Sequence, residues 1–174
     1  MKKTVLTYGL ISGGIAAILM PATLYFFGGH SSEIVGYTVI VLSMLLVFFG
    51  VRSYRENVGG GRLTFGRGFA VGILICLISS VCYVAVWELI YFKLAPEFAQ
   101  KCLYSQIDRM KESGAPQEQI DEATRQMDSF KKIYDNPLAN FAITMIEPFP
   151  VGLLITLISA VVLRRKEPPA NVAT

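Results

Sequence analysis

Four long stretches of the chain contain no charged residue or a single acid, and polar segments separate them. They lie at about residues 4–27, 34–51, 69–92 and 138–163. The shortest, of about 18 residues, would be about 27 Å long as an α-helix, close to the roughly 30 Å of a bilayer's hydrocarbon core. We therefore predict an all-α integral membrane protein, in which residues 1–174 form one membrane domain with four transmembrane helices.

The polar segment between the third and fourth stretches has a helical periodicity of its own. Apolar residues recur at spacings of three and four in two runs: Phe98, Cys102, Leu103, Ile107 and Met110, then Ile120, Ala123, Met127, Phe130 and Tyr134. A break at residues 113–116 separates the runs, and Pro116 suits the first position of a second helix. The pattern predicts a helical hairpin over about residues 96–135, either a self-packed cap or a docking surface for a partner or substrate.

Lysine and arginine in the short connections predict the orientation. Lys2 and Lys3 precede the first stretch, four arginines lie within residues 52–68, and Arg164, Arg165 and Lys166 open the tail at residues 164–174. Because positive charge favours the cytoplasmic side, both termini are predicted to be cytoplasmic and the hairpin extracytoplasmic. The first stretch is too long for the core of a signal peptide, and no A-x-A site follows it, so it is expected to remain as a span.

Small residues recur at helical spacing on three predicted spans. Residues 71–79 and 151–159 share seven of nine positions, and each copy places a glycine and a serine on one helix face. The candidate packing residues are Gly9, Gly13, Gly72, Ser79, Gly152 and Ser159. Small side chains let helices approach closely in lipid. The similarity is explained either by convergent packing chemistry or by an inverted duplication of the kind that transporters use.

Two acids, Glu88 and Glu147, lie inside apolar stretches, where an ionisable group is costly. Glu88 is 21 residues after Arg67 and Glu147 is 17 before Arg164, which predicts similar depths toward the outer side. If the two spans are neighbours, the carboxyls could share a proton, as a proton relay or cation site requires.

A structural interpretation of the two acids is also open. Pro148 and Pro150 lack N–H groups, so Glu147 could satisfy a nearby carbonyl or cap the helix restarting at Pro148. Glu88 lies close enough to the outer interface to reach water.

Composition excludes several kinds of chemistry. Charged residues make up only 17% of the chain, the net charge is +3, and one histidine with three cysteines offers no metal-ligand pattern or catalytic constellation. The glycine-rich stretch at residues 59–68 lacks the GK[ST] ending of a phosphate-binding loop. It fits a basic turn at an anionic membrane surface, with candidate lipid-headgroup contacts at Arg52, Arg55, Arg62 and Arg67. No cofactor and no nucleic-acid partner are expected.

The chain is similar to a widespread family of small bacterial inner-membrane proteins described only as a domain of unknown function. Five stretches carry the resemblance, at residues 8–13, 49–55, 60–66, 147–153 and 157–160. The resemblance implies four helices in the bacterial cytoplasmic membrane, with a variable outer insert between the third and fourth. It supplies no activity, cofactor or catalytic residue.

Two functions from different classes fit these features. The first is a non-enzymatic membrane component or accessory subunit, which contacts the lipid bilayer and forms a homo-oligomer or binds a membrane-protein partner. The alternative is an oligomeric transporter, or a proton- or cation-coupled pathway, that uses Glu88 and Glu147. An intramembrane enzyme is not favoured, because no catalytic constellation is present.

Overall fold

The computed structural model describes residues 1–27, 33–94 and 96–165, and its regular elements are helices. In chain order they are α1 (Lys2–Phe27), α2 (Glu33–Asn57), α3 (Phe65–Leu89), the π-helix η1 (Ile90–Leu94), α4 (Pro96–Glu112), α5 (Gln117–Tyr134), α6 (Pro137–Met145) and α7 (Pro148–Val162). Four segments are long and apolar enough to cross a membrane: Lys2–Thr23, Val35–Asn57, Phe65–Leu94 and Pro137–Val162. The predicted fold class is confirmed, with a helical hairpin, α4–α5, between the third and fourth spans.

Some sequence-based expectations fall outside the described residues. They concern the single histidine, His30, which lies between the first two spans, and Lys166 with the remainder of the tail. The side chains of Phe98, Cys102 and Leu103 on α4 also lie outside this part.

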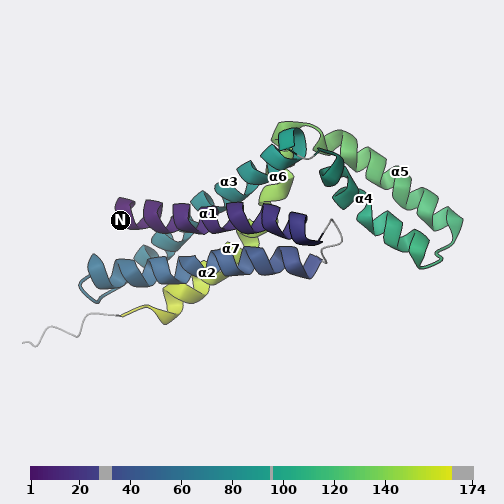
Figure 1. Cartoon of the computed structure of the whole chain (residues 1–174). Helices are drawn as coiled ribbons and strands as arrows, with labels where there is room; N and C mark the ends of the chain where they lie inside the picture. The colour runs from purple at the N-terminus through teal and green to yellow at the C-terminus, as the bar shows by residue number, and fades with distance from the viewer. Residues whose placement is uncertain (28–32, 95, 166–174) are drawn as a thin grey trace, which may run out of the picture.

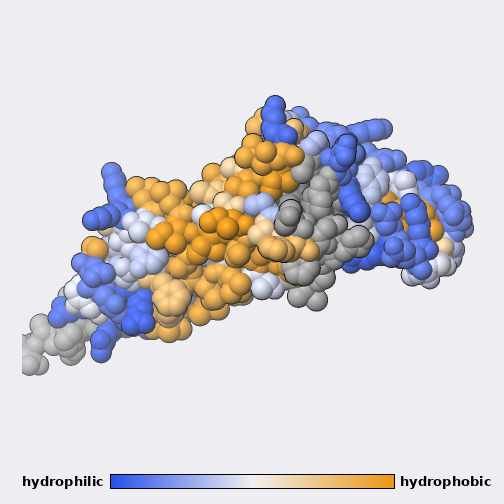
Figure 2. Space-filling view, in the orientation of Figure 1, coloured by the Kyte–Doolittle hydropathy of each residue, from blue (hydrophilic) through white to orange (hydrophobic). Residues whose placement is uncertain are grey.

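Helix α3 is the centre of the bundle. It packs against α1, α2, α6 and α7, and α2 also packs against α1 and α7. The N-terminus, the α2–α3 turn and the end of α7 lie at one end of the bundle, while the α4–α5 hairpin projects from the other (Figure 1). Hydrophobic residues form a band over the bundle between two hydrophilic ends (Figure 2). This distribution is the one that a bilayer requires of a multi-pass protein.

The connection between α2 and α3 is shorter than the polar composition of residues 52–68 suggests. Helix α2 continues to Asn57 and α3 begins at Phe65, because a helix can extend past the hydrocarbon into the polar interface. The Thr64 side chain caps α3 by accepting a hydrogen bond from the backbone N–H of Arg67 (3.4 Å). Gly60 and Gly61 supply the positive φ angles of the turn (59° and 81°).

The two similar segments of α3 and α7 pack directly on each other. A Cβ on Gly72 would lie 2.7 Å from Thr156 Cγ2, and a Cβ on Gly152 would overlap Cys76 Sγ. Each glycine is the second residue of its segment and faces the sixth residue of the other. The contact between the antiparallel helices is therefore reciprocal.

The first span also packs on α3 through small residues. Gly9 faces Ile78, whose Cγ2 would be 2.8 Å from an added Cβ, and Gly13 faces Cys82. Glycine at these positions allows the backbone of α1 to approach the side chains of α3 closely.

A cluster of buried serines joins three helices between these contacts. The Ser12 hydroxyl donates to the carbonyl oxygen of Ser43 (2.6 Å) and is hydrogen-bonded to Ser79 Oγ (2.5 Å). Ser159, the counterpart of Ser79, instead donates to the carbonyl of Ile155 in its own helix (2.6 Å). The two segments thus share a glycine contact but use their serines differently.

The hairpin differs in one local detail from the expectation. Pro116 precedes α5 as its N-cap residue instead of occupying the first helical position, and its carbonyl accepts from the N–H groups of Gln119 (3.0 Å) and Ile120 (3.2 Å). Gly114, with φ of 73°, makes the turn between the helices. Asn136 then caps α6 by accepting from the N–H of Leu138 (3.0 Å).

Candidate functional site

The fourth span is interrupted at Glu147, between the end of α6 and the start of α7. The Glu147 N–H donates to the carbonyl of Thr144 (3.2 Å), so that carbonyl is satisfied without the missing N–H of Pro148. The Glu147 side chain makes no capping bond to α7. It accepts a hydrogen bond from the buried Tyr83 hydroxyl on α3 instead (3.2 Å). The break therefore directs a carboxyl group at the neighbouring span.

A closed ring of hydrogen bonds lies about one helical turn closer to the hairpin. Trp87 Nε1 donates to the Tyr134 hydroxyl (2.8 Å), which donates to Thr144 Oγ1 (2.8 Å). Thr144 donates to Asn140 Oδ1 (3.2 Å), and Asn140 Nδ2 donates to the backbone carbonyl of Tyr134 (3.2 Å). Asn140 and Thr144 are buried, and each finds its partner inside the chain. These hydrogen bonds fix the end of α5 to α3 and α6.

The root of the hairpin, which is the end of α5 at Tyr134 and Asp135, is held by a second set of contacts at Asp135. The Tyr91 hydroxyl donates to Asp135 Oδ1 (2.6 Å), and Lys131 Nζ donates to Oδ2 (2.7 Å). The hydrogen bonds from Lys131 and then Tyr91 lower the pKa of Asp135 below its ordinary value. The Tyr91 and Tyr134 rings also meet edge to face, with centroids 5.3 Å apart.

Glu88 lies on a different face of α3. It lines a hollow of about 580 Å³ together with Ala85, Leu89, Phe92, Lys93, Pro137 and Phe141. Its Oε1 atom is buried and has no hydrogen-bond partner among the described residues. Glu88 and Lys93 bring an acidic and a basic side chain to the same hollow, whose other lining residues are apolar.

The two predicted acids take part in different contacts. Glu88 lines its hollow together with Phe141, whereas Glu147 accepts its hydrogen bond from Tyr83. Among the described residues no hydrogen bond joins the two carboxyl groups.

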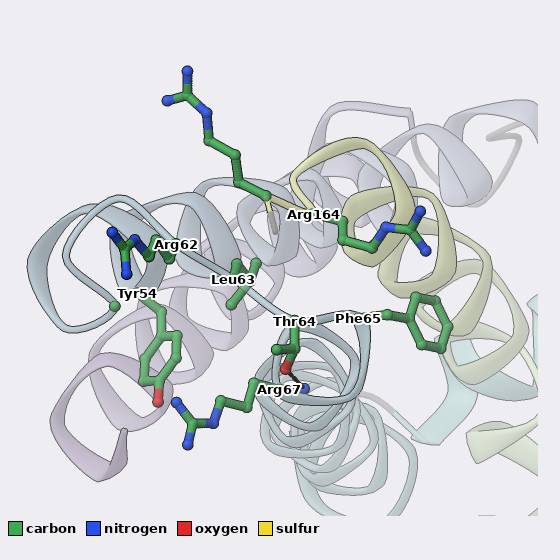
Figure 3. A pocket seen from close by; sticks show the side chains of 9 residues that line it. Tyr54, Arg62, Leu63, Thr64, Phe65, Arg67 and Arg164 are labelled. Atoms are coloured by element: carbon green, nitrogen blue, oxygen red, sulfur yellow. Dashed lines mark hydrogen bonds between the residues drawn. The ribbon is translucent and has the colours of Figure 1, made fainter. Parts of the chain in front are cut away.

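The second polar region is a hollow of about 740 Å³ at the opposite end of the bundle. Its lining residues are Tyr54, Gly59, Arg62, Leu63, Thr64, Phe65, Arg67, Arg164 and Arg165 (Figure 3). Residues about 100 positions apart meet here because Leu63 and Arg165 form an antiparallel bridge. The Leu63 N–H donates to the Arg165 carbonyl (3.2 Å), and the Arg165 N–H donates to the Leu63 carbonyl (2.9 Å).

The four candidate headgroup arginines fall into two groups. Arg62 and Arg67 line this hollow. Arg52 and Arg55 instead bind the same Glu56 oxygen, at 3.0 Å and 3.1 Å. From the sequence, Arg164 and Arg165 indicate only on which side of the membrane the tail is expected to lie. Their place in the hollow follows from the bridge, which no local pattern reveals.

The part of the chain that the structure describes holds no group of three or more His, Cys, Asp or Glu side chains placed to bind a metal ion. The polar groups of the two regions are a hydrogen-bond network at the hairpin end of the bundle and a set of arginines at the opposite end.

The helices, their hydrophobic band and the polar groups at both ends define a multi-pass membrane protein. Within that class, the sequence model of one family, described as "Protein of unknown function (DUF4199)", matches residues 7–165. The chain belongs to this family. Searches of curated proteins and of solved structures find no significant match.

Proposed function

We propose that this protein is a non-enzymatic component of a bacterial cytoplasmic membrane, an accessory subunit that binds a membrane-protein partner through its α4–α5 hairpin. Both termini would face the cytoplasm and the hairpin the outer side. Supporting this orientation, the basic α2–α3 turn and the end of α7 lie together, opposite the hairpin (Figure 1).

The observation that carries the proposal is the combination of a firmly held root and a free surface. The hairpin is fixed at Tyr134 and Asp135, while its far end projects beyond the bundle (Figure 1). Ile107 and Ile120 are buried between its two helices. A self-packed hairpin that is held at one end presents its remaining surface in a defined orientation, as a docking element must.

A hydrogen bond between side chains also joins the two helices of the hairpin. The Tyr104 hydroxyl on α4 donates to Asp128 on α5 (2.5 Å), and this bond raises the pKa of Tyr104 to about 12. Tyr104 therefore remains protonated, and so a donor, at physiological pH.

A small groove of about 250 Å³ runs along the hairpin. Its lining residues are Gln106, Ile107, Met110, Ala123, Gln126, Met127 and Phe130. Methionine adapts to different partners, and the two glutamines can hydrogen-bond around an inserted group. The groove has room for one large apolar side chain, so we infer that an amphipathic helix of the partner places such a residue here.

Site-specific photo-crosslinking in cells tests the proposal. A benzophenone amino acid at Met127, inside the groove, is compared with one at Ser129, which is exposed two residues further along α5. We expect one discrete adduct from Met127 and none from Ser129. The protein in the adduct should co-purify with the wild type, and Met127→Asp should abolish that co-purification.

The same experiment contains the outcomes that contradict the proposal. Equal adducts from Met127 and Ser129 would show random collision, and no adduct from either position would leave the hairpin without a docking role. Mass spectrometry of a discrete adduct distinguishes a second copy of this chain from another protein.

A second candidate function rests on Glu88, whose Oε1 atom is buried without a partner among the described residues. An unpaired acid at membrane depth is typical of proton or cation pathways. An oligomeric transporter of this kind would show ion flux in proteoliposomes that Glu88→Gln and Glu147→Gln reduce. Flux that both variants leave unchanged, or no flux at all, would exclude it.

A further inference from the structure

We propose that the hollow between the α2–α3 turn and the end of α7 binds the phosphate-bearing headgroup of an anionic phospholipid. The inference does not depend on the function of the hairpin, which lies at the other end of the bundle. It rests on the charge of the hollow, its backbone frame and its place at the edge of the hydrophobic band.

The hollow is basic and contains no acid. Four of its nine lining residues are arginines, and none is Asp or Glu. Arg67, Arg164 and Arg165 form no ion pair with other described residues, whereas Arg52 and Arg55 share an ion pair with Glu56. Guanidinium groups match phosphate oxygens in geometry and charge. An anion is therefore the ligand that this set of side chains favours.

The side chains surround the hollow instead of lying on one side of it. Arg62 and Arg67 lie on the side of Tyr54, and Arg164 lies beside Phe65 on the other side (Figure 3). The first turn of α3, which begins at Phe65, also borders the hollow, and N–H groups at a helix start favour anions. A phosphate group that enters the hollow thus meets donors from two directions.

The backbone frame of the hollow is well defined. Leu63 is only 2% exposed, and its bridge to Arg165 joins the turn to the end of α7. The Arg62 N–H donates to the Gly59 carbonyl (3.0 Å), and a side chain at Gly59 would overlap the Arg62 carbonyl oxygen. The arginines therefore project from a fixed scaffold, which distinguishes the hollow from a mobile basic tail.

The surroundings favour a lipid over a soluble anion. Phe65, a lining residue, is 39% exposed, and Val161 and Val162 at the end of α7 are each 63% exposed. These apolar side chains belong to spans that face hydrocarbon, so acyl chains can lie along them while the headgroup occupies the hollow. Anionic lipids of the cytoplasmic leaflet are attracted by basic residues at this level.

Native mass spectrometry of the full chain tests the site. Protein released from nanodiscs of phosphatidylcholine and phosphatidylglycerol should retain phosphatidylglycerol preferentially. The double variant R67Q/R164Q should lower the retained phosphatidylglycerol about fivefold or more, since each removed charge weakens the attraction. The matched control R52Q/R55Q removes the same charge from the same end, outside the hollow, and should change retention less than twofold.

Further measurements decide whether the ligand is a lipid or a soluble anion, and whether binding depends on the hollow or on general surface charge. If inorganic phosphate displaces the retained lipid at millimolar concentration, the hollow is a site for a soluble anion and the lipid assignment fails. Equal loss in both double variants would show that general surface charge is responsible, and no preference for phosphatidylglycerol would also overturn the proposal. The single variants R67Q and R164Q, each expected to give a partial loss, keep the test valid if the double variant does not fold.

Discussion

At the scale of single residues, the hairpin end of the bundle depends on polar contacts made across helices. Glu147 is recognisable in the sequence as an acid at membrane depth beside two prolines. Its partner, Tyr83, is not recognisable, because the pairing depends on the register of α3 against the fourth span. The hydrogen bond satisfies both groups in a place that water does not readily reach.

Removing the Tyr83 hydroxyl should destabilise the protein. Tyr83→Phe leaves the Glu147 carboxyl without its partner, which costs about 1–3 kcal/mol of unfolding free energy for a buried group. Reversible unfolding in mixed micelles measures this difference. The control is Tyr8→Phe, because no hydrogen bond of the Tyr8 hydroxyl is found among the described residues. A Tyr83→Phe variant as stable as this control would contradict the assigned role.

Two adjacent glycines in α1 provide a matched test of helix packing. Gly13→Ala places a methyl group against Cys82 of α3, whereas Gly14→Ala meets no atom within 4 Å. The first change should cost about 1–3 kcal/mol through overpacking. The second should be neutral or slightly stabilising, because alanine favours a helix more than glycine does. Thermal unfolding of both variants measures the difference, and equal midpoints would contradict the observed packing face.

At the scale of elements, the spans follow from long uncharged stretches and the hairpin from its hydrophobic periodicity, and the structure confirms both. Pattern alone does not reveal η1 or the N-cap position of Pro116, since both depend on how backbone N–H groups are shared at helix ends. The hydrophobic pattern does not reveal the arginine hollow either. Arg164 lies beside Phe65 because the bridge between Leu63 and Arg165 joins the α2–α3 turn to the end of α7.

The root of the hairpin should loosen in acid. The native contacts of Asp135 lower its pKa below the ordinary value of 3.8, so their stabilisation is present above that value and is lost as the pH falls below it. Hydrogen exchange at the end of α5 should therefore be faster at pH 3 than at pH 6, after correction for intrinsic rates. Asp135→Asn should raise the exchange at pH 6 and remove most of the pH dependence. Protection that is unchanged by the substitution would contradict this role.

At the scale of the whole molecule, polar groups are divided between two ends with different chemistry. One end carries the arginine hollow, and the other carries a polar network and a projecting hairpin (Figures 1 and 2). Such a division gives the protein a fixed direction in the membrane.

Thiol labelling tests that direction. In a background with Cys76, Cys82 and Cys102 replaced by alanine, Ser129→Cys should react with an impermeant maleimide in intact spheroplasts. Val58→Cys should react only after the membrane is opened, because this exposed residue lies in the α2–α3 turn at the basic end. The reverse pattern would invert the orientation and place the arginine hollow in the outer leaflet.

The reciprocal contact between α3 and α7 has a consequence for α3 alone. Gly72 is a notch and Cys76 is the knob that fills the corresponding notch at Gly152. A single α3 therefore carries both a notch and a knob of an antiparallel contact, and α7, which runs in the opposite direction, fills both within one chain. Two molecules inserted in the same direction would have parallel α3 helices, so this contact cannot form between the α3 helices of neighbouring copies in one membrane.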